Sequence, residues 1–325
     1  MVGEYAHIIA DSPDGARGVA GESERLAKDP SNLMLACFDC HDRIDRRGKQ
    51  NPYTNEQLQE MKREHEERIE IVYSATGVKL SLPIVMTFPV GPHIPVVELD
   101  DVHHAMLANS RHTRFPLGRG VRINKSDFDL LDGDAAFWAR AQRALEDMYE
   151  RRIHPELSEA SHLTIAAFAP IPMLMKLGAL VGDKVEASVL DLPSERWLWD
   201  TREHCPTPSF CFNVPAALPP EVSVAISISN LVNLPDDSRL SVEFRAEDPG
   251  RGIIRTESHM AEFRRTFNQF LMSLIRAGAQ VLHLYPATPL GASVEVGRVL
   301  LPKTLRQVHV YDWQDGAWLP ALRLK

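Results

Sequence analysis

The chain lacks the two features by which membrane and secreted proteins are recognised. No stretch approaches eighteen uncharged apolar residues, and the first residues, Met-Val-Gly-Glu-Tyr, are not a basic segment followed by an apolar run. A membrane-spanning helix needs the first feature, and a secretory signal peptide needs the second. We therefore predict a cytoplasmic protein that has no membrane partner.

An excess of positive charge is also missing. The 325 residues carry a formal net charge of −8, and the sequence pI is near 5.9. A constitutive DNA-binding domain presents a basic surface, so any contact with nucleic acid must be local or created when several chains assemble. The length predicts two or three structural units rather than one small domain.

Cysteine is scarce, and its spacing matters more than its number. The four cysteines form a Cys-x-x-Cys pair, Cys37 and Cys40, and a looser pair, Cys205 and Cys211. Disulfides are rare in the cytoplasm, so the first pair indicates metal or redox chemistry. The alternative is that Cys37 and Cys40 are buried free thiols that pack as small hydrophobic residues.

The first 45 residues contain the side chains that a metal-dependent phosphodiesterase needs. We predict a strand over residues 1–11, a loop over 12–31, a strand over 32–36 and a helix from 37 to about 47. Hydrolysis of a phosphodiester requires a base and a metal ion held in line. His7 is the candidate base and His41 a candidate ligand of a divalent ion. Asn32 either binds that ion or holds the loop beside His7.

This pattern resembles the HNH endonuclease family. The matching runs are Ala6-His7-Ile8 and Asn32-Leu-x-Leu-x-Cys37-x-x-Cys40-His41. The resemblance implies a ββα-metal unit with His7 as general base and with His41 and Asn32 at a catalytic Mg²⁺ or Mn²⁺. It also implies that Cys37 and Cys40 are half of a four-cysteine structural Zn²⁺ site.

The chain departs from the HNH pattern at two points. Many relatives place Asp or His directly before the base, where this chain has Ala6, so Glu4 and Asp11 are the candidate substitutes. The second Cys-x-x-Cys of the family usually precedes the first strand, and Cys205 and Cys211 have the wrong spacing to replace it. Either residues upstream of Met1 are missing, or this subfamily folds without zinc.

The rest of the chain predicts a helical linker and an α/β region. Thr54 and Gln57 form a capping box at the start of a helix that ends near Gly77. Strands and helices alternate from residue 80, which predicts an α/β fold with largely parallel sheets. The expected strands are 82–88, 121–123, 163–168, 184–190, 222–228, 240–244, 280–284 and 307–311, and the expected helices are 101–109, 135–152, 172–181, 257–277 and 292–300. The proline-rich stretch 205–220 divides this region into two lobes.

Two runs in this region have the order strand, proline turn, helix: residues 162–178 and residues 281–292. Parallel sheets bind ligands at the carboxyl ends of their strands, where helix N-termini present free N–H groups. Two such turns that face one cleft would suit a phosphate-bearing ligand. The alternative is that both runs are ordinary α/β connections.

Residues 80–325 resemble the SAVED sensor domain of bacterial CBASS anti-phage systems. The matching pieces are Phe168-Ala-Pro-Ile-Pro-Met-Leu, Trp197-x-Trp199, Val224-Ala-Ile-Ser-Ile-Ser, Arg255-Thr-Glu-Ser-His, Tyr285-Pro-Ala-Thr-Pro, Gly297-Arg298 and Val310-Tyr-Asp. The resemblance implies two fused CARF-like α/β lobes with a cyclic di- or trinucleotide bound between them. The candidate ligand contacts are Phe88, Pro170, Pro172, Lys176, Trp197, Trp199, Ser227, Ser229, His259, Tyr285 and Pro286.

An HNH unit followed by SAVED is the layout of the HNH–SAVED effector nucleases. We therefore expect an HNH domain over residues 1–50, a helical linker over 51–78 and a SAVED domain over 79–325. The expected function is a cyclic-oligonucleotide-activated, metal-dependent endonuclease that degrades double-stranded DNA in anti-phage defence by abortive infection. It would act as a homo-oligomer, a dimer that becomes a tetramer on activation. The alternatives are a sensor with an inactive or truncated HNH remnant and a constitutive HNH enzyme whose C-terminal half binds DNA.

Overall fold

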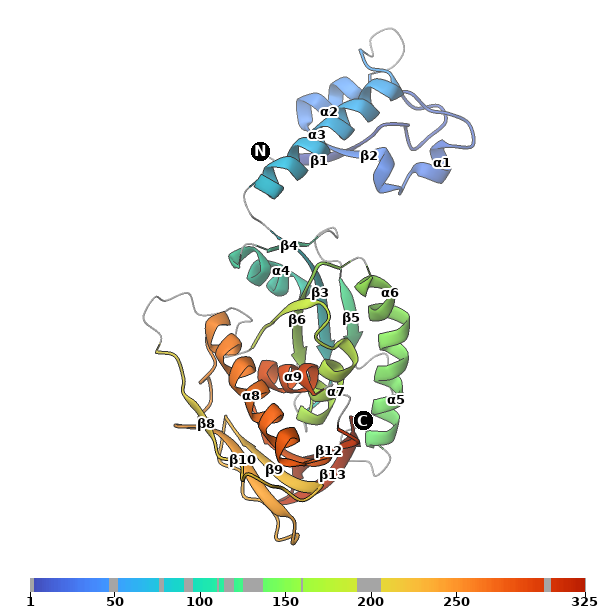
Figure 1. Ribbon diagram of the computed structural model, residues 1–325. Coiled ribbons are helices and arrows are strands. Elements are labelled where there is room, and N and C mark those ends of the chain that lie inside the picture. The colour runs from blue at the N-terminus through green and yellow to red at the C-terminus, as the bar shows by residue number, and fades with distance from the viewer. Residues whose placement is uncertain are drawn as a thin grey trace. The chain divides into compact units, whose positions relative to one another are not determined.

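The computed structural model describes residues 3–46, 52–75, 79–90, 96–109, 111–113, 120–124, 137–158, 160–191, 206–300 and 305–324. The chain divides into two compact units, Met1–Val78 and Lys79–Lys325, whose elements are labelled in Figure 1. None of the helices in the described ranges combines the length and the apolar character needed to cross a membrane.

The first unit has a two-stranded antiparallel sheet followed by a helix. Strand β1 (Gly3–His7) pairs with β2 (Leu33–Cys37), and α2 (Phe38–Ile44) begins at the next residue. The loop between the strands contains α1 (Ser23–Leu26) and a 3₁₀ turn, Pro30–Asn32. The order is the predicted one, but β1 ends at His7 rather than at Asp11, and Asn32 belongs to the 3₁₀ turn rather than to a strand.

Helix α3 (Asn55–Ala75) begins with the predicted capping box. The N–H of Thr54 donates to Gln57 Oε1 at 2.8 Å, and the N–H of Gln57 donates to Thr54 Oγ1 at 3.2 Å. The helix also contributes to the core of the first unit, because Leu58 is fully buried and belongs to one cluster with Ala6, Ile8, Ala36 and Ile44. The first turns of α3 are therefore part of the packed unit and more than a connector.

The second unit begins with a parallel sheet. Its strands are β3 (Lys79–Thr87), β4 (Arg111–Thr113), β5 (Val121–Asn124), β6 (His162–Phe168) and β7 (Glu186–Val189). The order is β4-β3-β6-β7, with β5 also paired to β3, and every pair is parallel. Helix α4 (Leu99–Ala108) packs against β3 and β4, and α7 (Ile171–Val181) follows β6.

The helix predicted over residues 135–152 is interrupted near its end. Helix α5 (Phe137–Met148) continues into a π-helical turn, Tyr149–Ile153, and then into α6 (His154–Leu157). Pro155 has no N–H for the carbonyl of Arg151, so a regular α-helical hydrogen bond cannot form at that point. The wider π turn lies where that bond is lost.

A second, mostly parallel sheet has the strand order β13-β12-β11-β9-β10-β8. The strands are β8 (Phe210–Phe212), β9 (Glu221–Ser227), β10 (Leu240–Ala246), β11 (Val281–Ala287), β12 (Gln307–Gln314) and β13 (Ala317–Arg323). The four central strands are parallel, and β8 and β13 are antiparallel edges. The prediction of two α/β lobes with largely parallel sheets is confirmed.

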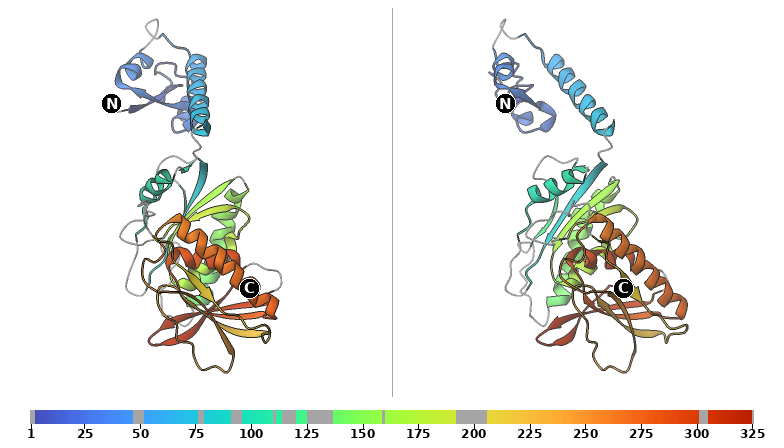
Figure 2. Two further views of the ribbon diagram at one scale, coloured as in Figure 1. Left: turned by 60° about the vertical axis from the view of Figure 1, so that its left-hand side comes forward. Right: turned by 90° about the vertical axis from the view of Figure 1, so that its left-hand side faces the viewer.

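The two faces of this second sheet differ. Helices α8 (Glu257–Ala277) and α9 (Leu290–Val299) lie over one face, as the views in Figures 1 and 2 agree. That face is apolar, and an aromatic cluster of Phe210, Phe244, Phe263, Phe267 and Phe270 packs α8 onto it. In the described part of the chain no helix covers the other face, which we call the outer face.

The two lobes meet through helices α7 and α9, which cross at a pair of glycines. A Cβ atom on Gly178 would lie 2.0 Å from the carbonyl oxygen of Val294, and one on Gly297 would lie 2.0 Å from that of Met175. Only residues without a Cβ permit so close an approach of two backbones. The crossing fixes the helix of each lobe against that of the other.

Candidate functional sites

In the first unit, His7 is the last residue of β1, and one nitrogen of its ring is hydrogen-bonded to the backbone. His7 Nε2 lies 3.0 Å from the carbonyl oxygen of Ala27. A carbonyl can only accept a hydrogen bond, so Nε2 carries the proton in this contact. In a neutral ring the other nitrogen, Nδ1, then holds the basic lone pair. This tautomer is the one that a general base acting through Nδ1 requires.

Asn32 is buried, and its side chain forms hydrogen bonds with the backbone near His7. Its Oδ1 accepts the N–H of Ile9 at 2.8 Å, while its Nδ2 donates to the carbonyls of Ile9 at 2.8 Å and Leu26 at 3.2 Å. Of the two roles considered for Asn32, these contacts support the one of holding the loop beside His7.

Arg17 is a residue of this site that the sequence did not single out. Its guanidinium donates to the carbonyls of His7 at 3.0 Å, Ile8 at 2.9 Å and Ile44. Burial lowers the pKa of Arg17, and the charge of Asp45 partly opposes that shift. Arg17 therefore ties the end of β1 to the end of α2. Its positive φ of 61° is uncommon for a residue with a side chain, but no sequence motif marks it.

His41 lies on α2 with a carboxylate on each side of its ring. Its Nδ1 is 2.7 Å from Glu4 Oε2, and its Nε2 is 3.3 Å from Asp45 Oδ2. Side chains of a strand alternate between two faces, so Glu4 lies on the opposite face of β1 from His7. His7 and His41 therefore have different hydrogen-bond partners: a backbone carbonyl for His7 and two carboxylates for His41.

Cys37 and Cys40 interact with each other at the start of α2. The N–H and the thiol of Cys40 both donate to the sulfur of Cys37 and lower its pKa, and the same thiol contact raises the pKa of Cys40. Both are free thiols, Cys37 half-buried and Cys40 exposed. The alternative of two buried hydrophobic cysteines is therefore wrong, since Cys40 faces solvent.

The described residues do not by themselves complete the metal sites that the HNH resemblance implies. They contain no group of three or more His, Cys, Asp or Glu side chains arranged to hold a metal. Both ring nitrogens of His41 face carboxylates, and the two thiols supply only half of a tetrahedral zinc site. We therefore derive no catalytic step through a metal ion.

In the second unit, the carboxyl edge of the first sheet meets the start of α9. A Cβ on Gly291 would lie 3.0 Å from the carbonyl oxygen of Leu190, directly after β7, and 2.9 Å from Met260 Cε on α8. The end of β9 joins the same edge, because the N–H of Ser229 donates to the carbonyl of Ala287 at 2.9 Å. Segments from both lobes therefore converge where α9 begins.

The N-terminus of α9 has backbone donors at this edge that find no partner inside the helix. The helix starts after Pro289, and its first internal bond runs from the Ser293 N–H to the Pro289 carbonyl at 2.9 Å. The preceding N–H groups of Leu290, Gly291 and Ala292 have no partner within the helix. The buried side chain of Thr288 contacts Ser293 Oγ at 2.7 Å and fixes this turn. The positive end of the helix dipole at such a terminus favours a phosphate group.

Several predicted ligand contacts lie at or near this edge of the sheets. Phe88 directly follows β3 and is buried, with its N–H donating to the Phe168 carbonyl at 2.8 Å. Pro170 and Pro172 form the buried start of α7. Ser229 is half-buried at the end of β9.

Lys176 and Ser227 are occupied by partners inside the protein. Lys176 is buried on α7 and pairs with Glu146 at 2.6 Å. Burial would raise the pKa of Glu146, but hydrogen bonds from Lys176 and Gln142 outweigh it and lower that pKa. Ser227 is fully buried and donates to Glu243 Oε1 at 2.7 Å.

His259, Tyr285 and Pro286 are also buried. His259 lies in the first turn of α8, where its N–H donates to Thr256 Oγ1 at 3.1 Å. Tyr285 lies on the outer face, and its ring is stacked 4.4 Å from that of Tyr311. Trp197 and Trp199, the predicted stacking residues, and Cys205 lie outside the described residues.

Comparisons with known proteins identify one matching family. The family described as "SMODS-associated and fused to various effectors sensor domain" (SAVED) matches residues 145–324, more than half of the chain. No curated protein matches the chain.

Two solved structures illustrate the likeness. One is the Acinetobacter baumannii Cap4 SAVED/CARF-domain containing receptor with the cyclic trinucleotide 3′3′3′-cAAA, 12% identical over 77% of this chain and 53% of that chain, with a TM-score of 0.47. The other is the Moraxella osloensis Cap4 receptor, 13% identical over 75% and 50% of the two chains, with a TM-score of 0.48. The chain spans about half the length of these structures.

Proposed function

The chain belongs to the SAVED family of sensor domains, and from this premise we propose that its second unit, residues 79–325, binds a cyclic oligonucleotide at the carboxyl edge shared by its two lobes. The convergence of Leu190, Gly291 and Met260 carries the proposal, because it brings both lobes to the start of α9. A cyclic oligonucleotide carries one phosphate per nucleotide, and the N–H groups of the first turn of α9, which have no partner within the helix, would offer donors for one of them.

A binding experiment with a charge-matched control tests this proposal. The parent chain is titrated calorimetrically with cyclic di- and trinucleotides and with a linear trinucleotide. Ser229→Glu places a carboxylate at the edge, and Gln269→Glu adds the same charge on the exposed face of α8. We expect one cyclic ligand to bind, at least about tenfold weaker binding in Ser229→Glu because like charges repel, and unchanged binding in Gln269→Glu. If no cyclic ligand binds the parent chain, or if Ser229→Glu binds as the parent does, the proposed site is wrong.

We further propose that the first unit is the effector and cleaves double-stranded DNA when the sensor is occupied. The supporting observation is the His7 ring, which the Ala27 carbonyl holds in the tautomer with a basic Nδ1. A base at that position would take the proton from the attacking water. Arg17 and Asn32 would keep the ring in place through the backbone on either side of it.

Plasmid degradation tests the effector proposal. Parent chain, His7→Ala and His65→Ala are assayed in Mg²⁺ or Mn²⁺ with and without the ligand identified by calorimetry. His65 lies on the exposed side of α3 and serves as the matched control. We expect cleavage only with ligand, loss in His7→Ala and full activity in His65→Ala. Ligand binding without any cleavage would leave the sensor standing and reject the effector. Cleavage without ligand would favour a constitutive nuclease.

A further inference from the structure

The outer face of the second sheet contains a pocket beside the segment that connects β9 and β10. It has a volume of about 320 Å³ and is lined by Ala225, Val232, Asn233, Leu234, Ser241, Val242 and Glu243. Strands β9 and β10 form its floor, and the segment that connects them forms its wall. Parallel sheets are usually covered on both faces. Here the connection contains no helix, which leaves this part of the sheet open.

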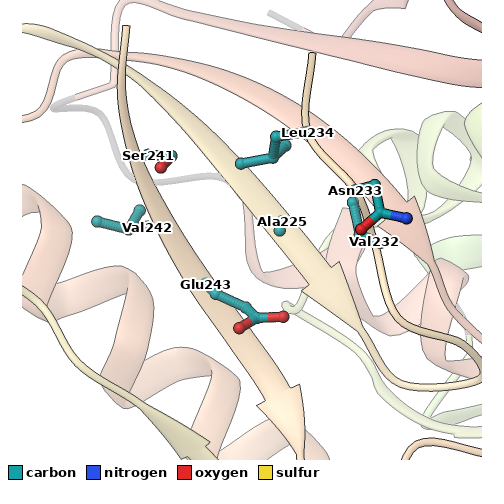
Figure 3. A pocket seen from close by; sticks show the side chains of 7 residues that line it. All are labelled: Ala225, Val232, Asn233, Leu234, Ser241, Val242 and Glu243. Atoms are coloured by element: carbon teal, nitrogen blue, oxygen red, sulfur yellow. The ribbon is translucent and has the colours of Figure 1, made fainter. Parts of the chain in front are cut away.

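Glu243 is the charged group of this pocket. Figure 3 shows its side chain reaching from β10 toward β9, with Asn233 on the connecting segment beyond Ala225. Its Oε1 accepts from the fully buried Ser227 hydroxyl at 2.7 Å. Among the described residues, Oε2 has no hydrogen-bond donor. Arg245 shares the face. Its guanidinium is hydrogen-bonded to Cys211, which is the main cause of its raised pKa, and the negative charge of Glu243 raises that pKa further.

The wall of the pocket is fixed to the sheet near each end of the connecting segment. Near its start, the N–H of Val232 donates to Ser227 Oγ at 3.1 Å, and Trp318 Nε1 donates to the Asn233 carbonyl at 2.8 Å. Near its end, Asp237 Oδ2 accepts from the Tyr285 hydroxyl at 3.1 Å. A pocket whose wall is already ordered loses little conformational entropy when a ligand binds. This pocket is therefore preorganised.

The chemistry of the lining selects a class of ligand. Glu243, Ser241 and Asn233 each offer a side-chain oxygen, while Ala225, Val232 and Leu234 provide apolar surface. An ammonium group has three donors and no acceptor, and an aliphatic stem packs against apolar walls. A guanidinium prefers a bidentate carboxylate, but one oxygen of Glu243 is already taken by Ser227. We propose that this pocket, the outer pocket, binds the ammonium group of an aliphatic amine, either a free diamine or a lysine side chain of a partner protein.

Calorimetry on the full chain tests the proposal with three ligands. Cadaverine represents a free diamine, and Nα-acetyl-lysine methylamide represents a lysine side chain. Nα-acetyl-norleucine methylamide keeps the stem and removes the amine. We expect one or both amines to bind, more weakly at high salt, and the norleucine compound not to bind. Binding of cadaverine alone would assign the site to free diamines. Binding of the lysine compound would assign it to a lysine side chain of a partner protein.

Two variants and a control locate the binding. Glu243→Gln keeps an acceptor for Ser227 and removes the charge, so the fold is retained and amine binding weakens at least about tenfold. Asn233→Ala removes an exposed amide and leaves the carbonyl that Trp318 needs, so it weakens binding to a lesser degree. Glu247→Gln changes an exposed carboxylate outside the pocket and leaves binding unchanged. The proposal is overturned if neither amine binds the parent, or if Glu243→Gln and Glu247→Gln bind amine equally. Binding of the cyclic oligonucleotide is unaffected in every variant.

Discussion

Replacing Gly178 by alanine tests whether the helix crossing holds the two lobes together. On an isolated helix this change would stabilise by about 1 kcal/mol. At the crossing, the new Cβ would lie 2.0 Å from the Val294 carbonyl oxygen, whereas real Cβ contacts stay at 3.0 Å or more. The helices would have to separate by about 1 Å, and overpacking of this kind costs about 1–3 kcal/mol or more. The overlap is severe, so we take the upper value of about 3 kcal/mol; subtracting the helical gain of about 1 kcal/mol leaves a net loss of about 2 kcal/mol.

Urea unfolding followed by circular dichroism measures this loss, with Gly250→Ala as the control. A Cβ on Gly250 meets nothing within 4 Å, so the control should be unchanged or slightly more stable, by less than about 1 kcal/mol. Because the crossing also fixes the start of α9, Gly178→Ala should weaken ligand binding as well. If Gly178→Ala were as stable as Gly250→Ala, the crossing of α7 and α9 would tolerate a Cβ at position 178, and the predicted role of this glycine would be wrong.

Three further predictions follow from single contacts. Asn32→Ala leaves the buried N–H and carbonyl of Ile9 without partners and should destabilise the first unit by about 2 kcal/mol in urea unfolding, whereas Ser31→Ala, on the exposed side of the turn, should not. Arg17→Met removes three bonds to backbone carbonyls and should abolish DNA cleavage without changing calorimetric ligand binding. Since the pKa of Glu146 is lowered, its contribution to stability is present above its unfolded pKa and is lost as pH falls through its folded pKa. Melting temperatures between pH 5 and 3 should therefore fall more steeply for the parent than for Lys176→Met. Equal slopes would show that the Lys176–Glu146 pair does not contribute to stability.

Helix limits were predictable where a local signal fixes them. Helix α8 runs from Glu257 to Ala277 as predicted, because Thr256 caps its start and Gly278, at φ +110°, ends it. The hairpin of β12 and β13 carries an equally local signal in Asp315-Gly316, both with positive φ, yet β13 was not predicted. Its side chains are mostly exposed and do not show the alternation of a half-buried strand.

The candidate sites were harder to predict, because neighbours in space decide which side chains are free. Asn32 was recognised, but its hydrogen bonds to Ile9 depend on how the loop folds back. The partner of Lys176 is Glu146, thirty residues earlier on another helix, and no spacing rule connects them. Arg17 acts only through backbone carbonyls, which leave no pattern in a sequence.

The end of β9 shows how one short run can serve two sites. Ser227 and Ser229 belong to one run that matches the SAVED family, and both are predicted ligand contacts. Ile228 is fully buried in the core, while Ser227 turns to the outer face and holds Glu243. Ser229 lies beyond the strand, at the edge where α9 begins. A substitution at Ser227 should therefore change amine binding at the outer pocket, and one at Ser229 should change binding of the cyclic oligonucleotide. If Ser227→Ala weakened cyclic-oligonucleotide binding as strongly as Ser229→Glu, the two sites would not be separate.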